Sequence, residues 1–327
     1  MKSKTADKFQ SVWNYVQIAR PDHWFKNVFM LPGFALAAFY SPEPFQWASV
    51  PTIILAIVAA CIVASSNYTI NEILDAPSDR LHPSKWSRPA AMGKINFAAG
   101  VAQWLILGIL GIALGLGLNP PFTMTLCVFW LMAGIYNIRP LRCKDIPYLD
   151  VLCESVNNPI RLALGWYALV PEVFPPVSLL LAFWMVGAFF MTAKRYAEYR
   201  SIGDHYKAGQ YRKSLAHYNE NRLLVAMFFY TAASAFCGGV FIVRYKLELV
   251  LSIPLLAGCF GYYLTLSFRD DSPVQRPEQL YLEKNFVSYL AVTALIMVGL
   301  VFVEIPAMYQ LFNVVPPSFE PLWRIGD

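Results

Sequence analysis

The segment NEILDAPSDRLHPSKWSRPAAMG, residues 71–93, follows directly on an apolar run at residues 48–70. It gathers acidic, basic and histidine side chains in a chain that is 57% hydrophobic and only 14% charged, whereas roughly a quarter of the residues of a soluble protein carry charge. Long apolar runs that end abruptly in charge are typical of helices that leave a membrane. We therefore expect an all-α, polytopic membrane protein in which this segment lies at the membrane surface.

Nine apolar runs are candidates to cross the hydrocarbon layer, which is about 30 Å thick and takes a helix of roughly 20 residues. They lie at residues 28–40, 48–70, 96–117, 121–138, 148–170, 175–194, 223–243, 248–267 and 286–307. The first run is short, so it either tilts or begins near Trp24. The predicted fold is a bundle of nine transmembrane helices over residues 28–307, with a polar segment at 1–27 and a tail at 308–327.

The distribution of lysine and arginine predicts the orientation, because basic residues in short loops stay on the cytoplasmic side. Of the 26 lysines and arginines, 22 lie in the N-terminal segment and in the loops after the second, fourth, sixth and eighth runs. The opposite loops and the tail hold only Arg244, Lys246 and Arg324. We expect a protein of the cell membrane with a cytoplasmic N-terminus, an extracytoplasmic tail, and the charged loops facing the cytoplasm.

Three oxygen-bearing side chains, Asn71, Asp75 and Asp79, are spaced four residues apart, so on a continuous helix each step drifts only about 40° around the axis. Their oxygens would then face one cavity, and such donors suit Mg²⁺ when room is left for phosphate. Pro77 could kink the helix and put Asp79 beyond its end. The alternative is a solvated helix end that only marks the membrane boundary. The residues that follow favour instead a polyanion bridged by metal: Arg80, His82, Lys85 and Arg88.

A second charged segment, AKRYAEYRSIGDHYKAGQYRKSL at residues 193–215, follows the sixth run. Its basic side chains suit direct binding of a phosphate at the membrane surface. The alternative is attraction to anionic lipids, at about 1 kcal/mol for each basic residue. Lys194 and Arg195 abut the membrane end of the run, so we favour substrate contact for these two. Both interpretations stay open for the other basic residues of this loop.

Polar residues also interrupt the fifth run, which contains Asp150, Glu154, Asn157, Asn158 and Arg161. Ionisable residues at membrane depth are costly and generally face a cavity or a partner. Glu154 and Asn157 or Asn158 can pair with Arg161 at helical spacing, which would be a structural role. A cavity that receives a substrate is the other interpretation.

These residues carry a family resemblance. The run NEILDAPSD is similar to the NDxxDxxxD motif of the UbiA superfamily of intramembrane prenyltransferases, although Glu72 stands where the family has Asp. Residues 71–93 resemble more closely the pattern NDxxDxxxDRxHPxKxxRPxAxG of its polyprenyl-phosphate phosphoribosyltransferase branch. Three further stretches resemble motifs of that branch, namely RPDHWFKN at 20–27, AKRYAE at 193–198 and RKSLAHY at 212–218. The resemblance implies a nine-helix fold with a metal-diphosphate site.

The resemblance implies that 5-phosphoribosyl is transferred from phosphoribosyl diphosphate to a polyprenyl phosphate lipid, with release of diphosphate. Mg²⁺ would be held by Asn71, Asp75 and Asp79. The expected catalytic residues are Asp75, Asp79 and Asp150, the last completing the metal site or contacting the ribose hydroxyls. The residues expected to bind substrate are Lys26, Asn27, Glu72, Arg80, His82, Lys85, Arg88, Arg161, Lys194, Arg195, Tyr196, Glu198, Arg212 and Lys213. No nucleic-acid partner is expected, and a homo-oligomer is neither required nor excluded.

Two other functions are weighed against this one. An aromatic prenyltransferase of the same superfamily would use a prenyl diphosphate donor, but its second loop carries an aspartate-rich motif, whereas cations replace most of the acids here. A transporter would line a path with Glu154 and Arg161. The polar motifs cluster on one side of the predicted bundle, which argues against alternating access.

Overall fold

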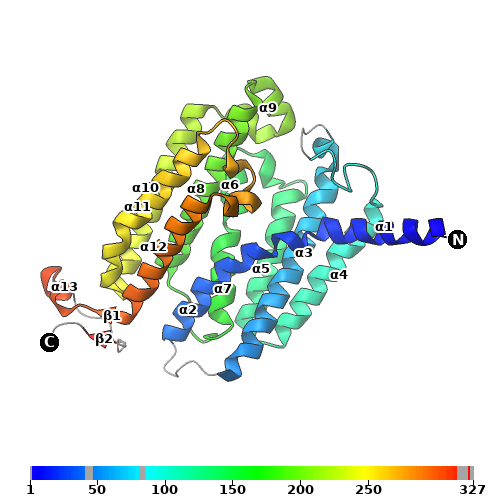
Figure 1. Cartoon of the computed structure of the whole chain (residues 1–327). Coiled ribbons are helices and arrows are strands. Elements are labelled where there is room, and N and C mark those ends of the chain that lie inside the picture. The colour runs from blue at the N-terminus through cyan, green and yellow to red at the C-terminus, as the bar shows by residue number, and fades with distance from the viewer. Residues whose placement is uncertain (1, 41–46, 81–84, 315–322, 325–327) are drawn as a thin grey trace. The chain divides into compact units, whose positions relative to one another are not determined.

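The computed structural model describes residues 2–40, 47–80, 85–314 and 323–324 of the chain, and these are mostly α-helical (Figure 1). The chain forms two compact units. Unit 1 comprises Met1–Pro175 and Tyr206–His217, and unit 2 comprises Pro176–His205 and Tyr218–Asp327. A short piece of the second charged segment thus belongs to the same unit as residues 71–93.

Unit 1 holds the helices of the first five apolar runs, with an N-terminal helix before them. Its elements are α1 (Lys2–Ala19), the 3₁₀ helix η1 (Pro21–Met30), α2 (Leu31–Tyr40), η2 (Trp47–Ser49), α3 (Val50–Asp79), α4 (Phe97–Leu116), α5 (Pro120–Asn137), η3 (Cys143–Asp145), α6 (Leu149–Ser155), α7 (Asn157–Tyr167), α9 (His205–Tyr211), which joins the unit from Tyr206 on, and η4 (Lys213–His217).

Helix α3 continues through Pro77 to Asp79, so the predicted kink does not end it. Proline has no amide to donate to the carbonyl four residues earlier. The last turn is held instead by the amide of Arg80, which donates to the carbonyl of Ala76 at 3.3 Å, and by Ser78 Oγ, which donates to the carbonyl of Asp75 at 2.9 Å. Both aspartates of the predicted metal site therefore belong to one continuous helix.

The fifth apolar run forms two helices, α6 and α7, which corrects the expectation of one continuous helix. Pro159 has no amide to donate to the carbonyl of Ser155, where α6 ends. The side-chain amide of Asn157 donates to the carbonyl of Glu154 at 2.9 Å and so satisfies one group at the break. The polar residues of this run therefore lie on two short helices.

Close backbone packing joins α2 to α7. A Cβ atom at Gly33 would overlap the carbonyl oxygen of Leu162, and one at Gly165 would overlap the carbonyl oxygen of Met30. Glycine is used here because another chain segment approaches the backbone closely. This contact fixes η1, which carries the RPDHWFKN motif, against α7, which carries Arg161.

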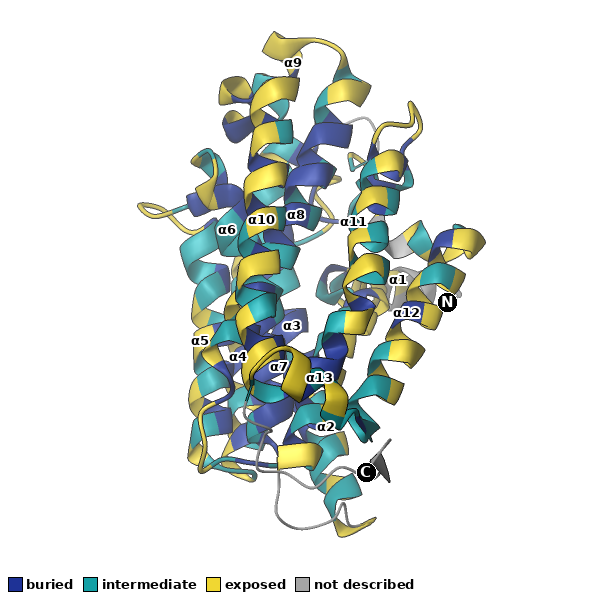
Figure 2. Cartoon of the chain, turned by 90° about the vertical axis from the view of Figure 1, so that its left-hand side faces the viewer, coloured by how far each residue is buried: buried dark blue, intermediate teal, exposed yellow. Residues whose placement is uncertain are grey.

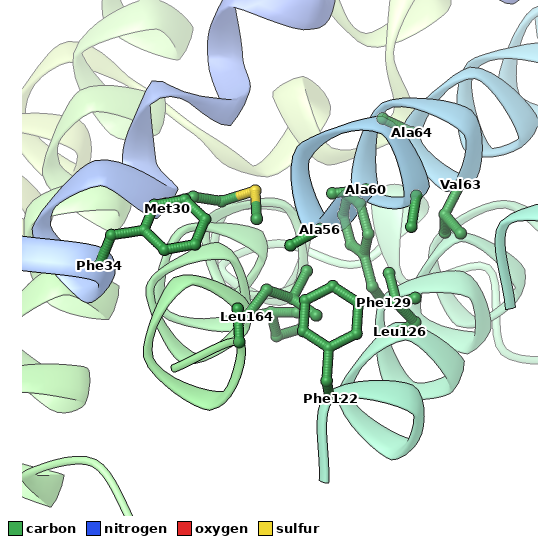
Figure 3. Close-up of a cluster of buried hydrophobic side chains, with 13 residues drawn as sticks. Met30, Phe34, Ala56, Ala60, Val63, Ala64, Phe122, Leu126, Phe129 and Leu164 are labelled. Carbon is green, nitrogen blue, oxygen red and sulfur yellow. The ribbon is translucent and has the colours of Figure 1, made fainter. Parts of the chain in front are cut away.

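The hydrophobic core of unit 1 fills the space between η1, α2, α3, α5 and α7 (Figure 3). Alanines such as Ala56 and Ala60 on α3 face the larger Phe122 and Phe129 of α5. Small residues on one helix and aromatic residues on the next allow close packing. Burial of these side chains fixes α3 against α5, and the charged residues lie at the C-terminal end of both helices.

Unit 2 is built around α8 and α10, which pack along each other. Its elements are α8 (Val177–Ile202), α10 (Glu220–Tyr245), η5 (Leu247–Ser252), α11 (Ile253–Ser267), η6 (Pro273–Gln275), η7 (Pro277–Leu282), α12 (Lys284–Phe302), α13 (Pro306–Leu311) and the two-residue strands β1 (Val303–Glu304) and β2 (Trp323–Arg324). The strands pair in parallel, with Val303 opposite Trp323.

Six helical segments of the described chain are long and apolar enough to cross a membrane: Trp47–Asp79, Phe97–Leu116, Val177–Ile202, Glu220–Tyr245, Leu247–Ser267 and Lys284–Phe302. Figure 2 shows exposed residues along α10 and α12, and these include Phe228, which is 76% exposed, and Leu295, which is 71% exposed. Large apolar side chains of this kind are expected on a surface that faces lipid. The chain is therefore a multi-pass membrane protein.

The other three predicted runs form α2, α5 and the pair α6 and α7. Helix α2 has 10 residues, which at 1.5 Å per residue gives about 15 Å, half the thickness of the hydrocarbon layer. The expectation of nine spans and of a cytoplasmic N-terminus stays a prediction.

Candidate active site

The last two turns of α3 bring two carboxylates to cationic side chains from other segments. Asp75 Oδ1 accepts a hydrogen bond from Lys144 Nζ and lies 3.5 Å from Arg142 Nη2. Asp79 Oδ2 accepts from Arg88 Nη1 at 2.6 Å. Charge-assisted pairs of this kind are stronger than neutral hydrogen bonds. Both aspartates of the predicted metal site are therefore surrounded by positive charge.

The loop between α5 and α6 supplies two of these cations, which sequence reasoning did not assign to the site. Lys144 is 4% exposed and also donates to Asn137 Oδ1 at 2.7 Å. Burial lowers the pKa of Lys144, and the negative charge of Asp75 opposes this shift. Arg142, held at φ 31°, reaches Asp145 Oδ2 through its Nε at 3.2 Å. The positive-inside rule already accounted for the basic residues of this loop, and no motif or spacing in the sequence marked them as part of the site.

The segment at residues 206–217 folds onto the same region of unit 1. Lys85 Nζ donates to Tyr211 Oη and lies 5.0 Å from the centre of that ring. Lys213 Nζ lies 3.6 Å from Asp145 Oδ2. The RKSL part of the second charged segment therefore lies beside the first charged loop, although more than a hundred residues separate the two in the sequence.

Asp150 links α6 to this segment. It is 0% exposed, accepts from Ser214 Oγ at 3.0 Å and lies 3.5 Å from Arg212 Nη1. The same guanidinium group reaches Tyr136 Oη at 3.4 Å, and that hydroxyl donates to Glu154 Oε2 at 2.9 Å. Asp150 therefore holds η4 in place from a position that is closed to solvent.

Arg161 lies deeper and contacts the N-terminal motif. Its Nε donates to Asn27 Oδ1 at 2.9 Å, its Nη1 donates to the carbonyl of Asn157 at 3.2 Å, and its guanidinium carbon lies 4.8 Å from the ring centre of Phe129. The amide of Asn27 in turn donates to Cys61 Sγ at 3.1 Å. Two of the predicted substrate-binding residues thus form a buried bridge between η1, α3 and α7.

The ring of Tyr68, one turn before Asn71 on α3, contacts three side chains of the N-terminal segment. Lys26 Nζ lies 5.6 Å and the guanidinium carbon of Arg20 lies 6.0 Å from the centre of its ring. The ring of His23 meets it edge-on at 5.2 Å between centroids. Cations over an aromatic face are attracted to it, so the RPDHWFKN motif is anchored to α3 at Tyr68, one turn before the predicted metal-binding residues.

The remaining predicted residues of unit 1 differ in burial. Asn71 is half-buried, whereas Glu72 is 3% exposed. Arg80 is exposed and its Nε donates to the carbonyl of Ala91 at 2.9 Å. His82 lies outside the described residues. Arg80 thus closes the turn after α3, which brings Arg88 back to Asp79.

In unit 2, the KRYAE residues lie on the last turns of α8. Arg195 is 1% exposed, and its Nη1 donates to Glu198 Oε2 at 3.0 Å. Tyr196 is also buried, and its hydroxyl donates to Glu220 Oε2 at 3.3 Å. Lys194 is half-buried. Arg195 and Tyr196 therefore tie the end of α8 to itself and to α10.

The donor set expected for Mg²⁺ can be tested against these contacts. Asn71, Asp75 and Asp79 recur every four residues on one continuous helix, and all three offer oxygen, the donor that Mg²⁺ prefers. Within the described part of the chain, no three His, Cys, Asp or Glu side chains are grouped to hold a metal ion. The predicted set has only two carboxylates and one amide, so substrate phosphates and water would supply the other ligands. The three predicted ligands therefore fit Mg²⁺, because all of their donor atoms are oxygens.

Comparison with known proteins gives a consistent result. Residues 28–291 match the UbiA prenyltransferase family. The decaprenyl-phosphate phosphoribosyltransferase of Mycolicibacterium smegmatis is 29% identical over 230 residues, which cover 69% of each chain. The enzyme of that name from Corynebacterium glutamicum is 29% identical over 211 residues, which cover 64% of this chain and 60% of the relative.

The fold is also shared with solved structures. A UbiA homolog from Archaeoglobus fulgidus, bound to GPP and Mg²⁺, superimposes with a TM-score of 0.65 at 17% identity, over 86% of this chain and 99% of the other. At this identity the likeness concerns the fold alone.

Proposed function

We propose, from the premise that the chain belongs to the UbiA prenyltransferase family, that it transfers the 5-phosphoribosyl group of phosphoribosyl diphosphate to a polyprenyl phosphate and releases diphosphate. Membership of the family makes the chain a membrane transferase. The relatives named decaprenyl-phosphate phosphoribosyltransferases support the finer assignment of donor and acceptor.

The observation that carries this proposal is the density of cations around the carboxylates of unit 1. Asp75, Asp79, Asp145 and Asp150 each lie within 3.5 Å of an arginine nitrogen. The cations come from the turn after α3, the loop after α5 and the segment at residues 206–217. Such a cluster suits a small donor that carries both a phosphate and a diphosphate, because arginine binds phosphate through paired hydrogen bonds.

We assign Mg²⁺ to Asn71, Asp75 and Asp79, where the bound ion would supply a Lewis acid for the departing diphosphate. The Mg²⁺ in structures of UbiA homologs supports this assignment. Lys85, Arg88 and Lys144 are assigned to the phosphate oxygens of the donor. Their positive charges stabilise the leaving group as negative charge accumulates on it.

In the proposed reaction, the bond between the anomeric carbon and the diphosphate oxygen breaks. A phosphate oxygen of the lipid forms the new bond from the opposite face. A phosphate anion is already a nucleophile, so the chain needs no strong base. Asp150, 0% exposed, is assigned to positioning Arg212 and Ser214 instead of contacting the reacting atoms.

For the lipid acceptor, we propose that Lys194 binds the phosphate group. Its neighbour Arg195 is buried and ion-paired with Glu198, so we assign Arg195 to positioning the end of α8. The lysine and arginine distribution supports a protein of the cell membrane with nine spans, a cytoplasmic N-terminus and an active site facing the cytoplasm.

The test is a transfer assay with the purified chain in detergent. Radiolabelled phosphoribosyl diphosphate, Mg²⁺ and a polyprenyl phosphate should give label in the lipid phase, and Asp75→Asn should remove it. Asp271→Asn, an exposed aspartate of unit 2, is the matched control. No label in the lipid, together with product from a prenyl diphosphate and an aromatic acid, would replace this function with aromatic prenyl transfer.

A further inference from the structure

A pocket of about 410 Å³ lies within unit 1, between α1, the start of η1, α3 and the turn at residues 85–93. Its volume falls in the range of small-molecule sites, roughly 300 to 1,000 Å³. Two guanidinium groups, two carboxylates, an amide and an indole are among the groups that line it: Arg20, Arg88, Asp22, Glu72, Gln17 and Trp13. The pocket thus adds α1 and Arg20 to the region of the predicted site.

One polar atom of a lining residue has no hydrogen-bond partner in the described part of the chain. Glu72 is 3% exposed, and its Oε1 has no hydrogen-bond partner among the residues that the structure describes. A buried carboxylate oxygen without a donor is unfavourable, and buried polar atoms of this kind usually receive a hydrogen bond from some molecule. This unsatisfied acceptor belongs to the wall of the pocket, where a hydroxyl or ammonium donor of a ligand would satisfy it.

Arg20 supplies a cation to the same lining. Its backbone is in the left-handed region, at φ 49° and ψ 57°, where a residue other than glycine is strained, and strain of this kind is common at ligand sites. Burial and the positive charge of Arg88 both lower the pKa of Arg20. Both guanidinium groups line the pocket, where the carboxylates of Asp22 and Glu72 partly offset their charge. A phosphate group in the pocket would interact favourably with both guanidinium groups.

Arg88 connects the pocket to the carboxylates of α3. It lines the pocket and also donates to Asp79 at 2.6 Å. A ligand in the pocket would therefore lie next to the side chains that we assign to the metal and the diphosphate. This contact favours a part of the donor as the occupant over the head group of a membrane lipid.

We propose that this pocket binds the pentose 5-phosphate end of the donor, with Arg20 on the 5-phosphate and Glu72 Oε1 accepting a hydrogen bond from a ribose hydroxyl. Trp13, which is 48% exposed, provides an apolar wall for the carbon face of the sugar. This inference rests on the proposed phosphoribosyl transfer and adds to it the residues that select the sugar.

The test measures binding of ribose 5-phosphate to the full-length protein in detergent by calorimetry, without Mg²⁺. This probe has no diphosphate and cannot be turned over. Arg20→Ala should weaken binding about ten- to a hundredfold, the usual effect of losing a charge-assisted hydrogen bond, and Arg20→Lys should weaken it less. Lys94→Ala, an exposed cation of unit 1, should leave binding unchanged.

Glu72 is tested through the sugar hydroxyls. The wild-type protein should prefer ribose 5-phosphate to either the 2-deoxy or the 3-deoxy analogue by about tenfold, and Glu72→Ala should abolish that preference. Glu72→Gln, which keeps an acceptor oxygen, should restore part of it. Glu172→Ala removes an exposed carboxylate of unit 1 and is the matched control. Thermal unfolding of each variant shows whether it is folded.

The outcomes separate this inference from the proposed function. The pocket assignment would be overturned if ribose 5-phosphate does not bind, even if label is transferred to lipid. It would also be overturned if folded Arg20→Ala binds ribose 5-phosphate as tightly as the wild type and folded Glu72→Ala keeps the wild-type preference over the deoxy analogues. Arg20-dependent binding of short-chain phosphatidylethanolamine in place of ribose 5-phosphate would overturn it in favour of a lipid head group. Binding that depends on Arg20 and Glu72, without any transfer to polyprenyl phosphate, would keep the pocket and reject the reaction.

Discussion

Two sets of ion pairs, one in each unit, differ in how far solvent reaches them: the pairs of Asp75 and Asp145 in unit 1, and the pair of Glu248 in unit 2. In unit 1, the side chains of Asp75 and Asp145 are 18% and 26% exposed. The cations of Asp75 come from the loop after α5, and Asp145 pairs with Arg142 of its own loop and with Lys213. In unit 2, Glu248 is 0% exposed and accepts from Tyr309 Oη at 3.1 Å and from the amide of Ile305 at 2.9 Å.

Solvent does not reach Glu248, because Lys246 Nζ lies 3.2 Å from Glu248 Oε2 and is itself buried. These contacts fasten η5 to the residues before and within α13. We propose that these ion pairs, although their chemistry is the same, serve different purposes. A carboxylate that keeps partial access to solvent, such as Asp75, can exchange a protein partner for a substrate or a metal, whereas the closed carboxylate of Glu248 holds segments together.

The largest effect is expected from Asp75→Asn. It removes the negative charge while keeping an acceptor for Lys144, so turnover should fall about a thousandfold and the unfolding midpoint should change little. The transfer assay and thermal unfolding in detergent measure the two quantities. If stability falls together with activity, Asp75 is structural in the same sense as Glu248, and the distinction between the two sets fails.

Glu248→Ala should show the opposite behaviour. Breaking a closed pair leaves Lys246 buried without its partner, which typically costs about 3 to 5 kcal/mol of unfolding free energy. Activity per folded molecule should stay at the wild-type level. Glu283→Ala is the control, since its pair with Arg269 is partly exposed and should cost about 0 to 1 kcal/mol. Reduced turnover in stable Glu248→Ala protein would give this group a functional role.

Lys144→Met should raise the KM for the donor about tenfold or more, because a cation assigned to phosphate is lost while the side chain keeps a similar length. The requirement for lipid phosphate should not change. Steady-state kinetics with each substrate varied in turn give the answer, with exposed Lys284→Met as the control. A defect confined to the lipid would move Lys144 to the acceptor side of the reaction.

The smallest effect is expected from Lys194→Ala. Lys194 is half-buried on α8, and its loss should raise the apparent requirement for polyprenyl phosphate several-fold, as for one charge-assisted contact made in partial solvent. The KM for the donor should stay the same. A defect selective for the donor would reverse the assignment of substrates to the two charged segments.

Local periodicity accounts for what could be predicted from the sequence. The four-residue spacing of Asn71, Asp75 and Asp79 is a property of one helix, and the apolar runs are properties of single segments. The six helices that qualify as spans correspond to six of the nine predicted runs. In these cases the pattern and the element that it specifies lie in the same stretch of chain.

Contacts between distant segments were not predictable in the same way. Lys144 meets Asp75 across 69 residues, Tyr211 meets Lys85 across 126, and Asn27 meets Arg161 across 134. Helical spacing suggested Glu154 and Asn157 or Asn158 as partners of Arg161, and its Nη1 does donate to the carbonyl of Asn157. Its Nε, however, donates to Asn27 on η1, a contact that the spacing could not indicate. Such pairs depend on how the loops fold back, which a single sequence does not encode in its local pattern.

The close approach of α2 to α7 determines which mutations in this region can be compensated by a second mutation. A Cβ atom at Gly33 or Gly165 would overlap a carbonyl oxygen of the main chain. Replacing a neighbouring residue by one with a smaller side chain therefore cannot make room for it. In a genetic screen, Gly33→Ala should therefore yield revertants to glycine and few second-site suppressors. Lesions in side-chain packing elsewhere in unit 1, in contrast, should be compensated by changes at neighbouring positions.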